Sequence, residues 1–138
     1  MDNGLFLQRL HADAFCLAIT FSVCKLTPPS ITEFSMPITQ RLAELGITLP
    51  QPAAPVAAYV PYVITGNLVY VSGQLPMDNG QVKVTGRVGS DVSLENGQLA
   101  ARVCALNILA QVQAACGGDL NRVERCVKLG GFVASSAD

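Results

Sequence analysis

The sequence predicts an α+β domain in which one long helix packs on one face of a sheet. Two β-rich runs joined by a two-residue turn lie within residues 58–76, and an apolar stripe at helical spacing lies within residues 94–116. A further β-rich stretch follows at residues 122–135. We expect one domain, because 138 residues supply one sizeable core but not two.

Composition excludes several classes of function. Apolar residues make up 50% of the chain and charged residues 14%, which is typical of a packed globular protein. The formal net charge is −1 and no basic patch is present, so nucleic-acid binding through phosphate neutralisation is not expected. Low charge on so apolar a chain indicates that part of the surface is buried against other copies of the chain.

Residues 1–35 differ in pattern from the rest. Their apolar run, AFCLAITFSVC, is 11 residues long, too short to span a bilayer. It has the length of a signal-peptide core, but Asp2 and Asp13 stand where basic residues are expected. Met36 directly precedes the first well-patterned segment. We therefore expect residues 1–35 to be an extension outside the fold and residues 36–138 to form a partial domain; a weak targeting peptide is the alternative.

The first element expected in the domain is a short helix at residues 38–46. Ile38, Leu42 and Leu45 recur at helical spacing, and Gly46 provides a C-cap. Residues 47–57 contain three prolines and predict an extended connector.

A β-hairpin is expected next. Its strands are residues 58–65 and 68–76, joined by Gly66-Asn67. This pair indicates a hairpin, because glycine accepts the positive φ of a tight hairpin turn. Residues 77–93 are glycine-rich and turn-like, with room for a short strand at residues 82–84.

The clearest element is a long helix over residues 94–116. Ser93 is its expected N-cap, Glu95 lies in the first turn, and Gly117-Gly118 ends it. The residues expected on its buried face are Ala101, Ala105, Ile108, Leu109, Val112 and Cys116.

One strand region, residues 122–135, follows this helix before the chain ends at Asp138. A single strand after the helix leaves the sheet small, so we expect a fold that is incomplete at its C-terminus. Unpaired sheet edges and exposed apolar surface are the expected consequences.

Histidine and cysteine usage narrows the chemistry. The one histidine, His11, lies outside the expected domain, so a Ser-His-Asp triad, a Cys-His dyad and a histidine-based metal site are not expected. The cysteines form no C-x-x-C pair and fit no zinc-site spacing. We expect reduced, mostly buried thiols in a cytoplasmic protein rather than a disulfide framework. The five are Cys16, Cys24, Cys104, Cys116 and Cys126.

Several stretches together resemble one protein family. They are Y-V-x-x-G-N-L-V-Y-V-S-G-Q-L-P, a turn region with G-x-V, the helix QLAARVCALNILAQVQAACGGDLNRV, and VKLGGFV. In this order they resemble the Rid/YjgF family, also known as the L-PSP endoribonuclease family and described as chorismate-mutase-like. The resemblance covers residues 37–135. RLAELGITLP and the Cys-Ala-Leu-Asn of the helix resemble a branch of the family with no settled activity.

This resemblance implies a homotrimer with small-molecule clefts between neighbouring subunits. It also implies hydrolysis of reactive enamines and imines, such as 2-aminoacrylate, to 2-keto acids and ammonia without a metal or cofactor. In that chemistry an arginine anchors the substrate carboxylate, and a carboxylic acid with backbone groups positions water at the imine carbon. No nucleic-acid partner and no membrane association are expected.

The family's site maps onto this chain only in part. Tyr59 matches a tyrosine at the cleft wall, and Ser72 and Gly73 match the pair that lines the pocket at the end of the second strand. The anchoring arginine lies in an A/P-R-S stretch and the acid in a V/I-E-x-E-A strand, and neither motif occurs in these 138 residues. We therefore assign no catalytic residue and expect this chain to be an inactive Rid-type imine deaminase.

Each candidate also has a structural interpretation. Ser72-Gly73 is also typical of a strand end with a bulge, and Tyr59, Tyr62 and Tyr70 are typical of cross-strand packing. Cysteines in this chain favour core packing over oxidant-sensitive roles. Three arginines are expected to be solvated surface charges rather than an anion clamp: Arg102, Arg122 and Arg125.

Two further functions stay open from the sequence. One is a non-catalytic trimer that binds a small ligand or a partner, favoured by the branch resemblance and the low charge. The other is an endoribonuclease, for which the domain offers neither a histidine nor a basic groove.

Overall fold

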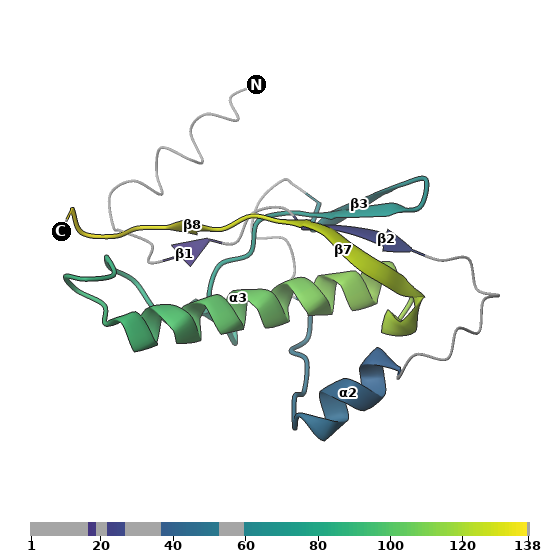
Figure 1. The fold of residues 1–138 in the computed structure, drawn as a ribbon, viewed down its shortest axis with the longest axis horizontal. Coiled ribbons are helices and arrows are strands. Elements are labelled where there is room, and N and C mark those ends of the chain that lie inside the picture. Colours follow the sequence, from purple (N-terminus) through teal and green to yellow (C-terminus); the bar gives the residue numbers. More distant parts are fainter. Residues whose placement is uncertain (1–16, 19–21, 27–36, 53–59, 138) are drawn as a thin grey trace.

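The computed structural model describes residues 17–18, 22–26, 37–52 and 60–137 (Figure 1). Its helices are α2 (Ile38–Glu44) and α3 (Leu94–Ala115), with a 3-10 turn, η1 (Leu120–Arg122). Its strands are β1 (Leu17–Ala18), β2 (Ser22–Leu26), β3 (Tyr62–Thr65), β4 (Leu68–Val71), β5 (Met77–Asp78), β6 (Gln81–Val82), β7 (Val123–Leu129) and β8 (Phe132–Val133).

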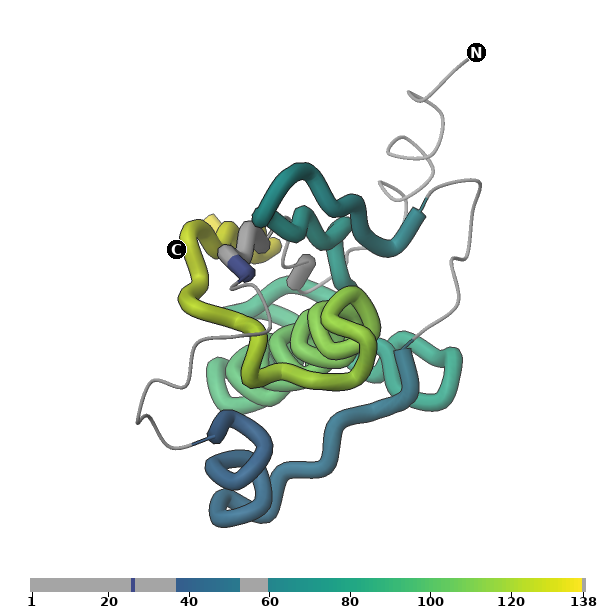
Figure 2. Tube along the Cα trace, turned by 90° about the vertical axis from the view of Figure 1, so that its right-hand side faces the viewer, coloured from purple at the N-terminus to yellow at the C-terminus, as the bar shows by residue number. Residues whose placement is uncertain are grey.

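The elements form layers, with α3 between the main sheet and α2 (Figures 1 and 2). The main sheet has the strand order β3-β4-β2-β7, and each neighbouring pair is antiparallel. Strands β1 and β8 form a separate antiparallel pair, as do β5 and β6. The α+β class with a long helix on one face of a sheet is confirmed, although the strands divide among three small sheets.

The hairpin of β3 and β4 is confirmed at the expected turn. Tyr62 pairs with Val71 and Thr65 with Leu68, and Gly66 in the turn has φ 59°. Both strands are shorter than expected. Regular pairing stops after Val71, and Pro76, farther along the expected second strand, has no N–H to donate to a strand ladder.

The long helix begins and ends where its caps predict. Ser93 adopts an extended conformation, and its hydroxyl oxygen accepts a hydrogen bond from the Asn96 N–H over 3.2 Å. Gly117 and Gly118, with φ 70° and 96°, follow the last turn. These glycines adopt the left-handed conformations that end a helix at low steric cost.

The buried face of α3 is rotated by about one residue from the expected stripe. Ala101, Ala105 and Leu109 are only half-buried. Two polar residues occupy buried positions, and a pattern of apolar residues alone cannot place them. The buried residues of α3 are Ala100, Cys104, Asn107, Ile108, Ala110, Gln111 and Val112.

The core lies between α3 and the inner face of the hairpin. Val69 and Val71 of β4 are almost completely buried, and they pack with the buried face of α3. Ile38 and Leu42 of α2 are half-buried and pack against the same core. The buried residues that make up this core are Leu26, Val69, Val71, Ala100, Cys104, Ile108, Val112, Cys116 and Leu120.

Strand β2 differs from the expectation that residues 1–35 lie outside the fold. It pairs antiparallel with β4 on one side and with β7 on the other, and Leu26 is buried in the core. The edges of β4 and β7 that face each other carry N–H and C=O groups that need hydrogen-bond partners. Strand β2 lies between them and supplies partners for both edges. Apart from β1 and β2, residues 1–35 lie outside the described residues.

Within the ranges that the structure describes, neither helix combines the length and apolarity needed to cross a bilayer.

Candidate ligand site at the end of β4

Ser72 lies directly after β4 and is fixed by the segment before β3. Its hydroxyl donates to the main-chain oxygen of Val60 over 2.7 Å, and its N–H donates to the oxygen of Pro61 over 2.9 Å. The hydroxyl proton is therefore engaged. The hydroxyl oxygen keeps lone pairs that can accept a hydrogen bond from a ligand.

The two residues after Ser72 differ in solvent exposure. Gly73 is exposed, whereas Gln74 is buried, with a solvent-exposed fraction of 8%. The Gln74 side-chain amide donates to the main-chain oxygen of Ser72 over 3.0 Å. Ser72 and Gly73 thus form an accessible surface that a buried glutamine supports from inside.

Asn107 of α3 fixes the continuation of this segment. Its Nδ2 donates to the main-chain oxygens of Leu75 and Met77 over 3.1 and 3.0 Å. Sequence reasoning missed this residue. Its signal is a lone amide in an apolar stretch of the helix, directly between Leu106 and Ile108.

Tyr62 and Tyr70, the tyrosines of the β3–β4 hairpin, lie on different faces. Tyr59 lies outside the described residues, so its expected place at the cleft wall stays a prediction. Tyr62 pairs with Val71 while Val63 pairs with Tyr70, and alternation therefore puts Tyr62 and Tyr70 on opposite faces of the hairpin. Tyr62 packs against the core.

The expected surface role is confirmed for two arginines. Arg102 on α3 and Arg125 on β7 are exposed. Arg122 differs, because it is half-buried and its Nη1 donates to the main-chain oxygen of Cys116 over 3.0 Å. A cation at this position satisfies a terminal carbonyl of α3 and complements the negative end of the helix dipole.

The cysteines also divide. Cys104 and Cys116 are buried free thiols, as expected, and burial raises the pKa of the Cys116 thiol while the nearby Arg122 partly opposes the shift. The expectation of core packing is wrong for Cys126, which is exposed on β7. Strand β7 lies at the edge of the sheet, and all its residues after Val123 are exposed.

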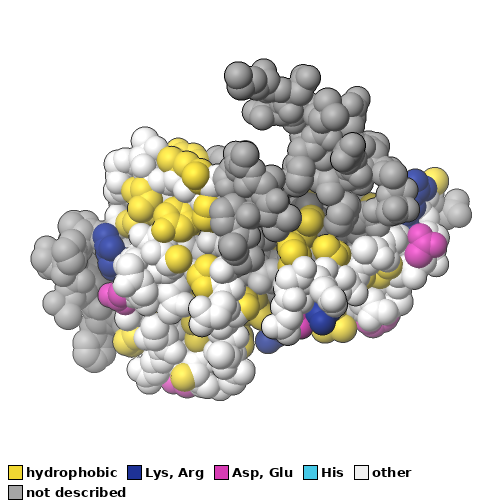
Figure 3. Space-filling view, turned by 180° about the vertical axis from the view of Figure 1, so that it is seen from behind, with side chains coloured by type: hydrophobic (Ala, Val, Ile, Leu, Met, Phe, Trp, Pro, Cys, Tyr) yellow, Lys and Arg dark blue, Asp and Glu magenta, His cyan; other side chains and the backbone are white. Residues whose placement is uncertain are grey.

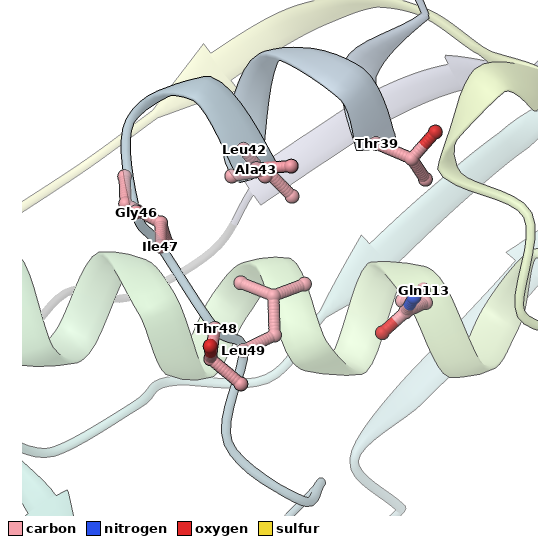
Figure 4. A pocket seen from close by; sticks show the side chains of 8 residues that line it. All are labelled: Thr39, Leu42, Ala43, Gly46, Ile47, Thr48, Leu49 and Gln113. Atoms are coloured by element: carbon pink, nitrogen blue, oxygen red, sulfur yellow. The ribbon is translucent and has the colours of Figure 1, made fainter.

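A separate pocket lies between α2 and α3 (Figure 4). Its volume is about 490 Å³, and its lining carries no charged side chain. Ser72 and Gly73 are not part of it. The lining residues are Thr39, Leu42, Ala43, Gly46, Ile47, Thr48, Leu49 and Gln113.

Large apolar side chains are exposed on the sheet. Figure 3 shows hydrophobic side chains gathered over the end of the molecule that carries the β3–β4 hairpin. Val63 and Ile64 on β3 remain about half exposed, at 49% and 48%. Four more large apolar side chains are exposed on strands: Val127 and Leu129 of β7, and Phe132 and Val133 of β8.

The chemical groups near Ser72 favour binding over activation of a nucleophile. The Ser72 hydroxyl donates to a carbonyl oxygen and not to a base that could remove its proton. In the part of the chain that the structure describes, no cluster of three or more His, Cys, Asp or Glu residues is placed to hold a metal ion.

Comparison with known proteins matches residues 39–137 to a family model described as "YjgF/chorismate_mutase-like, putative endoribonuclease". A curated relative, Protein TCP17 from Trypanosoma cruzi, is 48% identical over 99 residues, which cover 72% of this chain and 61% of that protein.

Two solved structures share the fold. The protein Atu1372 from Agrobacterium tumefaciens, of unknown function, is 56% identical with a TM-score of 0.65, covering 73% of this chain and 61% of that one. A "putative endoribonuclease" from Shewanella oneidensis is 37% identical with a TM-score of 0.59, covering 63% and 57%. The chain therefore spans about three fifths of the length of these relatives.

Proposed function

Because the chain belongs to the YjgF/chorismate mutase-like family, we propose that its site is that of a Rid-type imine and enamine deaminase. The observation that carries the proposal is the pair Ser72 and Gly73, held at the end of β4 with Gly73 exposed. This is the position at which the family resemblance expects the floor of a small-molecule cleft.

The geometry of Ser72 suits an imine or enamine. The hydroxyl proton goes to Val60, so the oxygen presents lone pairs that accept the N–H of a substrate. Gly73 has no side chain to keep a ligand away from the main chain. Water adds to the imine carbon to give a carbinolamine, which collapses to a 2-keto acid and ammonia.

Two steps of this reaction use groups that the family resemblance places in motifs absent from residues 1–138. The substrate carboxylate needs a guanidinium anchor, and the added water needs a positioned acid. Neither the A/P-R-S motif nor the V/I-E-x-E-A motif occurs in this sequence. We therefore expect these 138 residues by themselves to bind but not to turn over substrate.

The test generates 2-aminoacrylate in situ and measures the rate of 2-keto acid formation with the protein and in buffer alone. We expect the rate with residues 1–138 to equal the buffer rate. Hydrolysis above that rate, lost in Ser72→Ala, would establish activity and overturn the expected inactivity.

A homotrimer is part of the same proposal. The large apolar side chains exposed on β3, β7 and β8 support it, because apolar surface that one chain leaves exposed can be buried between chains. Light scattering after size exclusion should give three times the 14.5 kDa chain mass. Ile64→Glu should reduce that mass, whereas Gln98→Glu, an exposed change on α3, should not. A monomeric wild-type protein would contradict the trimer.

The second candidate is a non-catalytic trimer that binds a small ligand. It is favoured by the engaged proton of Ser72, which leaves the hydroxyl an acceptor rather than a nucleophile. Titration with 2-ketobutyrate, followed by backbone amide shifts, distinguishes the candidates. Saturable shifts at Gly73 without turnover support the binding protein, and shifts confined to the pocket of Thr39 and Gln113 contradict both candidates.

An endoribonuclease is the third candidate, favoured by the description of the family and of the Shewanella oneidensis structure. The net charge of −1 and the absence of histidine from residues 12–138 argue against it, because contacts to RNA phosphates rely on clustered cations and general-base cleavage commonly relies on an imidazole. RNA cleavage that co-purifies with wild-type protein and disappears in Ser72→Ala would establish it.

A further inference from the structure

Two cysteines from distant parts of the sequence occupy paired positions on neighbouring strands. Cys24 of β2 lies opposite Cys126 of β7 in the antiparallel register. The next pair is Lys25 with Arg125, so Cys24–Cys126 belongs to a short run of continuous pairing. Register shifts bound this run on both sides.

Directly opposed positions of antiparallel strands meet the first geometric condition for a disulfide. Their Cα atoms are about 4.5–5.5 Å apart, and disulfides join Cα atoms about 4.4–6.8 Å apart. Opposed positions also belong to one face of the sheet, because successive positions alternate between faces along both strands in step. We propose that Cys24 and Cys126 are the site of a reversible disulfide that fastens β2 to β7.

Solvent access favours Cys126 over the buried cysteines as the point of attack. Cys126 is exposed on an edge strand, whereas Cys104 and Cys116 are buried. Thiol exchange needs access of the reagent to the sulfur. Burial also raises the pKa of Cys116 and so lowers its thiolate fraction, which adds to its protection.

The oxidant is a low-molecular-weight disulfide such as oxidised glutathione. The Cys126 thiol loses its proton to solvent, and the thiolate attacks one glutathione sulfur, releasing one glutathione thiolate. The Cys24 thiolate then attacks the Cys126 sulfur of the mixed disulfide and releases the second glutathione. Two protein thiols are oxidised, one glutathione disulfide is reduced to two thiols, and the leaving thiolates take up the two protons.

The disulfide would hold β2, a strand that lies outside the residues matched by the family model. The match begins at residue 39, whereas β2 ends at Leu26 and yet fills the place between β4 and β7. A bond between Cys24 and Cys126 closes a loop of about 100 residues, and long loops restrict the unfolded chain most. Oxidation therefore holds β2 in the sheet, and reduction releases this restraint.

The experiment treats the native full chain with oxidised glutathione at low protein concentration and maps disulfides by tryptic mass spectrometry. The bond should join tryptic peptide 10–25, which follows cleavage after Arg9, to peptide 126–128, which follows cleavage after Arg125. The number of free thiols should fall from five to three, and reduced glutathione should restore it.

Peptide 10–25 also contains Cys16, so matched variants decide the partner. The link should persist in Cys16→Ser and vanish in Cys24→Ser and in Cys126→Ser. It should form faster in the native protein than in urea. A link that requires Cys16, a link between two chains on a non-reducing gel, or no link in the native protein would each overturn the proposal.

Discussion

The side-chain amide of Asn107 donates to the main-chain oxygen of Leu75 over 3.1 Å, which joins the middle of α3 to the segment after β4. The same amide nitrogen donates to Met77 over 3.0 Å. One buried helix residue thus holds the chain on both sides of Pro76, just beyond Ser72 and Gly73. The candidate site is therefore positioned by the helix beneath it as well as by its own strand.

Replacing Asn107 with Leu should destabilise the fold. The change keeps a similar volume but removes the amide donor from two oxygens: the Met77 oxygen loses this bond, and the Leu75 oxygen keeps only the N–H of Met77. Leaving buried polar groups unsatisfied costs about 1–3 kcal/mol. Urea unfolding followed by circular dichroism should show a lower midpoint with an unchanged slope.

The matched control for this helix is Asn96→Ala. Asn96 is exposed in the first turn of α3, and a surface change there should alter stability by no more than about 0.5 kcal/mol. If Asn107→Leu proved as mild as this control, the two hydrogen bonds of Asn107 would not contribute to holding residues 75–77.

Gly89 should not tolerate a side chain. Its φ is +95°, and a Cβ there would overlap Ser136 Oγ. The loop pairs closely with the C-terminal segment, since Val88 N–H donates to Ala134 and Ser136 N–H donates to Val88, each over 2.9 Å. Gly89→Ala should cost about 1–3 kcal/mol, because backbone strain of this kind costs that much. Thermal unfolding measures the loss.

A double variant separates the two sources of that cost. Adding Ser136→Gly to Gly89→Ala removes the overlap but not the strain at positive φ, so stability should recover only in part. Gly131→Ala is the control, because a Cβ at Gly131 meets nothing within 4 Å. Full recovery in the double variant would mean that φ contributes nothing.

Elements with strong local signals could be predicted from the sequence. Ser93 and Gly117 mark the ends of α3, and Gly66 marks the hairpin turn, because caps and tight turns depend on residues close in sequence. At the candidate site, the position of Ser72 after β4 followed from the same hairpin. Its hydrogen bond to Val60 did not, because the pairing between the ends of β3 and β4 determines it.

Features that depend on long-range pairing could not be predicted. Strand β2 gave no sign in the sequence of which edges it would join, because its pairing with β7 spans about 100 residues. An apolar pattern predicts a surface position for an amide such as Asn107, whereas its hydrogen bonds to two carbonyl oxygens make its burial favourable. The sequence predicts core packing for Cys126, because it does not reveal that β7 is an edge strand.

Ser93→Ala should affect both stability and a titration. The hydroxyl of Ser93 accepts from Asn96 N–H, and losing an N-cap of this kind costs about 1 kcal/mol. The pKa of Glu95 lies below its ordinary value because of a hydrogen bond with its own backbone and another with Ser93. NMR titration of Ser93→Ala should therefore show the pKa of Glu95 raised toward 4.5.

The direction of the acid dependence follows from that lowered pKa. A carboxyl with a lower pKa in the folded state stabilises the protein above its unfolded pKa and loses that contribution as the pH falls through the folded pKa. Glu95→Gln should therefore flatten the acid side of the stability curve. Gln98→Ala, also exposed on α3, should leave it unchanged. An unshifted pKa of Glu95 in Ser93→Ala would contradict the role of the cap.

Cys116 should make the fold weaker at alkaline pH. Burial raises the pKa of its thiol above 9.0, with partial opposition from Arg122. Below the unfolded pKa of this thiol both states are protonated, and the full stability is present. Above it the unfolded state loses its proton first, so the free energy of unfolding falls as the pH rises toward the folded pKa.

Urea unfolding at several alkaline pH values should show this decline in wild type and a shallower one in Cys116→Ala. The exposed thiol supplies the control, Cys126→Ala, whose decline should match wild type. An equal slope in all three proteins would mean that the buried thiol does not cause the dependence.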